Sequence, residues 1–141
     1  MTRVDFYVTA QSGALARERL ACRLAAKAVK LGHRLHIHLA DEAALKRLDD
    51  LLWTFSDASF LAHDALGAHA AAPVTLATGG APQPVPELLI NLADDIPKFF
   101  SNFPRVAEII SADAATRELG RERFRFYRDR GYPLQHHELG H

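Results

Sequence analysis

The chain has 141 residues, 48% of them hydrophobic, and its 17 Lys and Arg balance its 17 Asp and Glu. This length and composition predict one globular domain and exclude a disordered chain. A neutral total argues against bulk electrostatic binding to nucleic acid. The single cysteine, Cys22, cannot form a disulfide within the chain, and neither a signal core nor a membrane-spanning run is present. We therefore expect a soluble, cytoplasmic protein.

Strands and helices alternate through the first part of the sequence. Residues 4–8 are β-branched and aromatic and predict a strand, and residues 15–31 follow with the apolar spacing of a long helix. Residues 35–39 alternate as in a second strand, and Asp41 is a suitable N-cap for a helix over 42–52. The order of strand, helix, strand and helix is typical of a parallel α/β sheet.

The second part of the chain adds further strands and a last helix. We expect strands at 59–63, 73–77, 88–92 and 105–110, a short helix or turn at 96–103, and a last helix between Asp113 and Gly131. Together the elements predict a three-layer α/β/α sandwich of about six mostly parallel strands, with helices on both faces. One domain over residues 1–132 would then be followed by a ragged tail over 133–141.

The predicted fold is similar to that of nucleoside-triphosphatases, but the phosphate-binding loop is absent. The turn after the first strand, residues 9–13, contains neither G-x-G-x-x-G nor G-x-x-x-x-G-K-[ST]. Gly79 and Gly80 lie in a loop without the Lys and Ser or Thr that would contact phosphates. A nucleotide-type fold without this loop favours a binding module that needs no cofactor.

The last helix carries a stripe of arginines. At 100° per residue, Arg117, Arg121, Phe124 and Arg128 share one narrow side, with Arg125 at its edge. Guanidiniums interleaved with an aromatic ring suit a ligand that is both acidic and apolar. The alternatives are a solvated helix face held by salt bridges, or a surface that binds single-stranded DNA directly.

Two other patterns have a chemical interpretation. His137-Glu-Leu-Gly-His141 matches H-E-x-x-H, which would make the protein a zinc-dependent hydrolase, but that site needs a helix and a third ligand. We favour a tail without a metal. His36 and His38 are interpreted as hydrogen-bonded histidines of a strand, and Cys22 as a small core residue.

Five segments, taken in order, resemble the chi subunit of bacterial DNA polymerase III holoenzyme. The resemblance runs essentially from end to end and rests on residues 48–53 (LDDLLW), 59–63 (SFLAH), 72–74 (APV), 89–92 (LINL) and 121–128 (RERFRFYR) followed by Gly131 and Tyr132. It implies a non-catalytic accessory subunit of a DNA-directed DNA polymerase complex. It also implies a nucleoside-triphosphatase-like fold that has lost its phosphate loop.

The resemblance further implies partners and site residues. This family joins the clamp-loader complex to single-stranded DNA-binding protein at the replication fork, by binding the acidic, Phe-terminated tail of that protein. Carried over, Arg121 would hold the terminal carboxylate of the tail, and Phe124 and Ile110 would line the pocket for its phenyl ring. Arg125 and Arg128 would meet the preceding aspartates.

A second surface is implied at Trp53 and Phe60. There the family binds the psi subunit of the clamp loader or, alternatively, a repair helicase. Core packing is the other explanation of these two aromatic residues, because both stand near the end of a predicted helix. Nucleic acid would be reached only indirectly, through protein partners.

Overall fold

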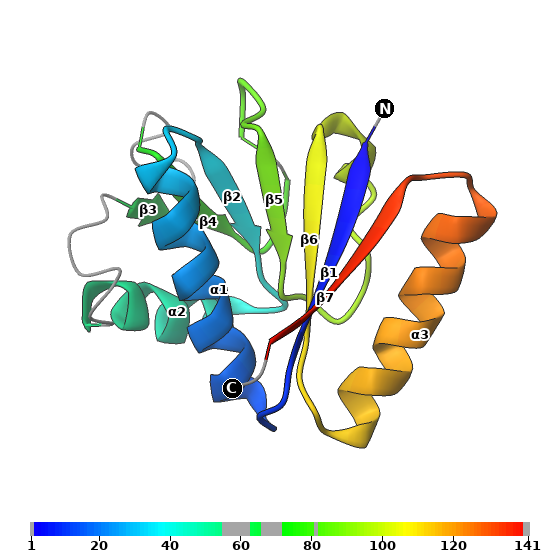
Figure 1. Ribbon diagram of the computed structural model, residues 1–141. Coiled ribbons are helices and arrows are strands. Elements are labelled where there is room, and N and C mark those ends of the chain that lie inside the picture. The colour runs from blue at the N-terminus through cyan, green and yellow to red at the C-terminus, as the bar shows by residue number, and fades with distance from the viewer. Residues whose placement is uncertain (1, 55–62, 66–71, 81, 140–141) are drawn as a thin grey trace.

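Seven parallel strands form the central sheet of the computed structural model, which describes residues 2–54, 63–65, 72–80 and 82–139 (Figure 1). Their order across the sheet is β3-β4-β2-β5-β6-β1-β7. The strands are β1 (Arg3–Thr9), β2 (Leu35–His38), β3 (His63–Ala65), β4 (Val74–Ala77), β5 (Leu88–Asn91), β6 (Arg105–Ile110) and β7 (Leu134–Leu139).

Helices cover both faces of this sheet. On one face lie α1 (Ala14–Lys30) and α2 (Glu42–Thr54), and on the other lie α3 (Ala114–Asp129) and a short 3-10 helix, η1 (Phe100–Asn102). The alternation along β6 separates the two layers: Ala107 packs in the α1 and α2 core, and its neighbour Val106 packs in the α3 core. The predicted three-layer α/β/α architecture is confirmed.

The inner strands are short and buried on both sides. Every residue of β2 and β4 is buried, as expected for parallel strands covered by helices on both faces. Asp41 accepts the backbone N–H of Ala44 at 2.8 Å, which confirms its predicted role at the start of α2. The loop between β5 and β6 contributes Phe100 and Phe103 to the α3 core.

The expected ragged tail over 133–141 is wrong for residues 134–139, which form β7. This strand pairs in parallel with β1, from Val4 opposite Leu134 to Thr9 opposite Leu139. The strand was not predicted because its residues are mainly polar. An edge strand needs little burial and is held mainly by backbone hydrogen bonds, here to β1. The described sheet therefore has seven strands rather than about six, and every pairing is parallel.

Part of the predicted strand at 59–63 lies outside the described residues. Residues 59–62, with Phe60 among them, are not described, and β3 begins at His63. The other predicted strands are found within one residue of their expected ends.

Candidate functional site

A buried polar network fixes how α3 lies on the sheet. Glu108 of β6 is fully buried and accepts hydrogen bonds from Arg123 at 2.7 Å, from the Tyr127 hydroxyl at 2.7 Å and from Asn91 at 3.0 Å. Arg123 also donates to the carbonyl of Ala93 at 2.7 Å. Burial, together with the nearby Glu108 charge, raises the pKa of Tyr127, so its hydroxyl remains a donor. The network turns Arg123 inward and leaves the arginines of the opposite helix side outside.

A hollow of about 270 Å³ lies between α3 and the strands β1, β6 and β7. Its apolar floor includes Phe6 and Ile110, which are nearly fully buried. Phe124 forms one wall; the residue is 36% exposed, and its ring centroid lies 5.6 Å from that of Phe6. The complete lining is Phe6, Val8, Ile110, Arg117, Gly120, Arg121, Phe124, His136 and Glu138. We call this hollow the α3 pocket.

Two arginines stand at the rim of the α3 pocket. The Arg121 side chain is 63% exposed, and its Nη1 lies 3.1 Å from Glu118 on the same helix. An exposed pair of this kind contributes at most about 1 kcal/mol, so Arg121 can exchange it for a ligand carboxylate at small cost. Arg117 is also exposed, and Glu138 is the one carboxylate in the lining.

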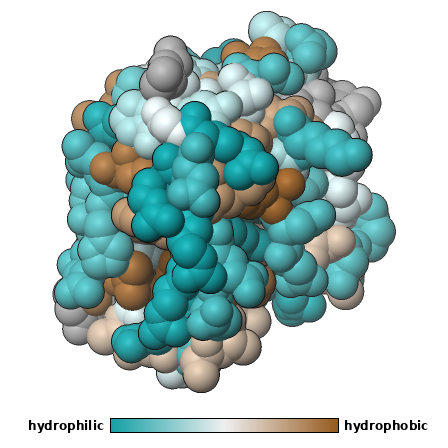
Figure 2. Space-filling model, turned by 90° about the vertical axis from the view of Figure 1, so that its right-hand side faces the viewer, coloured by the Kyte–Doolittle hydropathy of each residue, from teal (hydrophilic) through white to brown (hydrophobic). Residues whose placement is uncertain are grey.

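The hydropathy of the surface around α3 agrees with a pocket that is apolar inside and charged at its rim. Figure 2 shows a hydrophilic column with hydrophobic patches beside it. The polar exposed residues of α3 supply such a column, and the α3 pocket opens on one flank of the helix. A ligand bound there would contact charge and apolar surface together.

The structure brings some predicted residues together and leaves others apart. Arg121, Phe124 and Ile110 meet in the α3 pocket. Arg125 and Arg128 are exposed on α3 but do not line the pocket, and Arg128 lies 3.2 Å from its neighbour Asp129.

Sequence reasoning missed the contribution of β7 to this site. The register places His136 beside Phe6 and Glu138 beside Val8, so both side chains reach the α3 face of the sheet. The available signal was topological: a strand that follows the last helix can return by a short connection to the outer edge of β1, which is otherwise unpaired.

The second predicted surface is separate from the first. Trp53 lies near the C-terminal end of α2 and is 56% exposed, while Phe60 is outside the described residues. In Figure 1, α2 and α3 lie toward opposite ends of the sheet. A partner at Trp53 would therefore not compete directly for the α3 pocket.

The H-E-x-x-H pattern does not form the helix that a zinc protease needs. Residues 137–139 belong to β7, so His137 and Glu138 point to opposite faces of the sheet. The His137 ring stacks on Tyr7 at 4.7 Å, and its Nε2 lies 3.2 Å from Asp5. In the described part of the chain, no group of three His, Cys, Asp or Glu side chains could hold a metal ion.

The carboxylate of Asp113 lies at the N-terminus of α1, where a nucleotide-binding fold would hold a phosphate. The backbone N–H of Gly13, at the start of α1, donates to Asp113 at 3.0 Å. The same carboxylate accepts hydrogen bonds from Ser111 and Thr116, which hold the pKa of Asp113 far below its usual range. A fixed negative charge would repel a phosphate from this helix N-terminus.

No helix among the described residues has the length and apolar character to cross a bilayer.

Comparison with known proteins gives a consistent family. The model of the family described as DNA polymerase III chi subunit, HolC, matches residues 1–135. The DNA polymerase III subunit chi of Pseudomonas aeruginosa is 47% identical over 139 residues, covering 99% of this chain and 98% of that protein. The DNA polymerase III subunit chi of Escherichia coli K12 is 31% identical over 144 residues, covering 95% of this chain and 96% of that protein.

A solved structure supports the fold alone. The crystal structure of T4 UvsW superposes with a TM-score of 0.66 at 8% identity, covering 99% of this chain and 42% of that one. An α/β fold can carry unrelated functions, so this likeness says nothing about activity. The family match and the curated relatives carry the assignment: the chain belongs to the DNA polymerase III chi subunit family.

Proposed function

We propose that this chain is a non-catalytic adaptor of DNA replication that links the clamp-loader complex to single-stranded DNA-binding protein. It would do so by binding the acidic, Phe-terminated tail of that protein in the α3 pocket. The observation that supports this proposal most strongly is the position of Arg121, at the rim of a hollow floored by Phe6 and Ile110.

The chemistry of the pocket matches both parts of such a tail. A terminal carboxylate would form charge-assisted hydrogen bonds with Arg121, and the phenyl ring would replace water against Ile110 and Phe124. Arg117 would add attraction to the aspartates that precede the ring. We expect a micromolar dissociation constant, about 8 kcal/mol, because a flexible tail loses entropy when it docks.

The second part of the proposal concerns Trp53 and Phe60. We place the psi subunit of the clamp loader, or a repair helicase, on this surface at the replication fork. The exposed Trp53 indole supports the assignment, since exposed tryptophans are frequent energetic centres of protein interfaces.

The tail proposal is tested by fluorescence anisotropy with a labelled acidic peptide that ends in a free Phe carboxylate. Arg121→Ala should weaken its binding by about 1.5–3 kcal/mol, because a charge-assisted hydrogen bond is lost. Arg19→Ala, which removes another exposed arginine, on α1, is the matched control and should change affinity less than twofold. Unchanged affinity in Arg121→Ala would refute the site.

A peptide with an amidated C-terminus separates the carboxylate from the rest of the ligand. We expect the amide to bind the parent protein about as weakly as the free acid binds Arg121→Ala. The amide should also be insensitive to that substitution, since its partner group is already missing. Additive losses from the two changes would mean that Arg121 contacts another part of the tail.

A further inference from the structure

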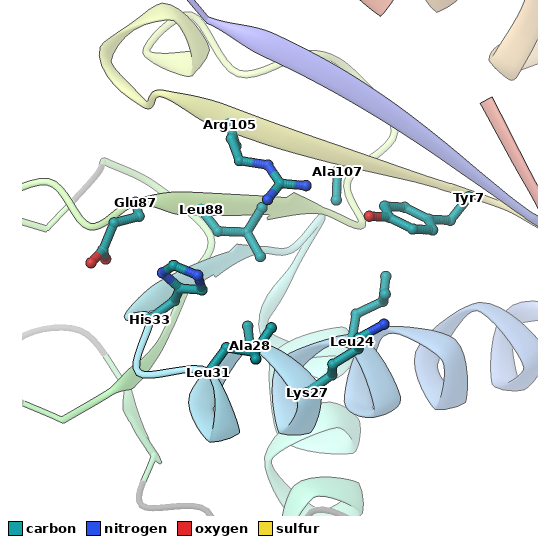
Figure 3. A pocket seen from close by; sticks show the side chains of 10 residues that line it. All are labelled: Tyr7, Leu24, Lys27, Ala28, Leu31, His33, Glu87, Leu88, Arg105 and Ala107. Atoms are coloured by element: carbon teal, nitrogen blue, oxygen red, sulfur yellow. The ribbon is translucent and has the colours of Figure 1, made fainter. Parts of the chain in front are cut away.

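A second hollow, of about 320 Å³, lies on the opposite face of the sheet (Figure 3). It opens between the C-terminal half of α1 and the strands β1, β5 and β6. The topology creates it: α1 starts beside the end of β1 and must cross to reach β2, three places away in the sheet. Two small side chains, Ala28 on α1 and Ala107 on β6, leave the space between helix and sheet unfilled. We call this hollow the α1 pocket.

The walls of the α1 pocket are mainly apolar. Leu24 and Leu88 line it together with the two alanines, and Leu31 stands at its mouth on the last turn before β2. Leu31 is 65% exposed, the highest fraction among the large exposed hydrophobic residues of the described chain. An apolar wall that continues onto an exposed leucine suits a ligand longer than the hollow itself.

Charged groups lie in and beside this pocket. Asp5 accepts hydrogen bonds from Arg105 at 3.0 Å and from Arg3 at 3.4 Å, so two guanidiniums share one carboxylate. One positive charge is left over, and the Nε of Arg105 is buried without a hydrogen-bond partner among the described residues. Lys27 adds an exposed ammonium to the lining.

Two further polar groups, Tyr7 and Glu87, line the pocket. The Tyr7 hydroxyl points into the space in Figure 3, and burial, followed by the charge of Asp5, raises its pKa, so it stays a donor. Glu87 is the one acidic residue of the lining, and its carboxylate is engaged by the backbone N–H of Arg34 at 3.0 Å. The donors and the surplus positive charge therefore line an apolar cavity, from the sheet at Arg105 and Tyr7 and from α1 at Lys27.

We propose that the α1 pocket binds an internal segment of a partner protein, in which one large apolar side chain is flanked by acidic residues. The apolar side chain would fill the hollow between Ala28 and Ala107. The acidic groups would lie at Lys27, Arg105 and the Tyr7 hydroxyl, and the neighbouring backbone would cover Leu31. The site is on the other face of the sheet from the α3 pocket, so both can be occupied at once.

The test uses a labelled peptide, acetyl-Gly-Glu-Asp-Phe-Leu-Asp-Gly-amide, whose blocked ends give it no terminal carboxylate for the α3 pocket. Saturable binding is expected by fluorescence anisotropy at low salt, and replacing Phe and Leu by Gly should abolish it. Lys27→Glu should weaken binding at least fivefold. Lys30→Glu, the same charge change on the same helix outside the lining, should alter it less than twofold.

Two more variants locate the ligand. Tyr7→Phe keeps the ring and removes only the hydroxyl, and it should weaken binding about threefold or more. Arg121→Ala, in the α3 pocket, should leave binding of this peptide unchanged. Absence of saturable binding up to millimolar peptide overturns the proposal, as do equal losses in Lys27→Glu and Lys30→Glu, which would reduce the effect to net charge.

Discussion

Four arginines lie along the exposed side of α3, but only Arg117 and Arg121 line the α3 pocket. The resemblance assigns the aspartates of the tail to Arg125 and Arg128. The geometry adds Arg117, which lines the α3 pocket where those two arginines do not. We predict that Arg117→Ala weakens tail binding by about 1 kcal/mol or more, because Arg117 lines the α3 pocket and would face the bound segment. Arg128→Ala should cost less, since that side chain already pairs with Asp129. Isothermal titration with the free-acid tail peptide gives the ranking, and a larger loss in Arg128→Ala would show that the tail leaves the pocket in the other direction.

His36 gives the fold a dependence on pH. The residue is fully buried in β2 with its Nδ1 2.7 Å from Thr75, and burial, followed by the nearby His38, lowers its pKa from 6.5 to about 4. The unfolded chain therefore binds this proton at higher pH than the folded chain. The contribution of His36 to the free energy of unfolding is fully present above about pH 6.5. It should fall by up to about 3 kcal/mol as the pH drops toward 4.

Urea unfolding at several pH values between 7 and 4 measures this loss. His36→Asn should flatten the dependence, and His33→Asn, at an exposed position, should leave it as it is. His38 has a lowered pKa as well, so part of the slope should remain in the His36 variant. An unchanged slope in His36→Asn would assign the effect to other groups.

At the level of elements, Gly120 sets how closely α3 approaches β6. A Cβ on this residue would lie 3.0 Å from the Cδ1 of Ile110, whose side chain also lines the α3 pocket. We predict that Gly120→Ala keeps the fold, because alanine favours a helix by about 1 kcal/mol and the Ile110 side chain can turn aside. Tail binding should nevertheless weaken severalfold, since Ile110 would move into the hollow. The melting temperature and the anisotropy titration together check this, and tighter binding would contradict it.

The elements also show what local sequence patterns can and cannot predict. Helix α3 was predictable because Asp113 and Gly131 mark its ends and its arginine stripe follows from helical periodicity alone. That same locality made Arg121 and Phe124 accessible to sequence reasoning. Strand β7 was not predictable in this way, since its polar residues have no pattern of burial and its partner, β1, is about 130 residues away. Because the strand was not predicted, the place of His136 in the α3 pocket was not predicted either.

For the whole molecule, the alternation of strands and helices was enough to predict the layers but not the order of the strands. The sheet places β1 between β6 and β7, and this neighbourhood brings Phe6 under Phe124. No local signal specifies that arrangement, because it depends on which long-range pairing buries the most surface. The same holds for the α1 pocket, which exists only because α1 crosses from β1 to β2 over intervening strands.

Charge is the property of the whole molecule that bears most directly on how it would reach DNA. Equal numbers of basic and acidic residues leave no net attraction for a polyanion, although α1 and α3 each carry more basic than acidic residues. We predict that a labelled 35-nucleotide thymidine oligomer binds the protein alone with a dissociation constant above roughly 100 µM in 150 mM salt. Adding single-stranded DNA-binding protein should retain the chain on the oligomer, and Arg121→Ala should abolish that retention while Arg19→Ala preserves it. Tight binding of the oligomer by the chain alone, weakening steeply with salt and lost in Arg121→Ala, would instead make α3 a nucleic-acid surface and would leave the protein tail without a role there.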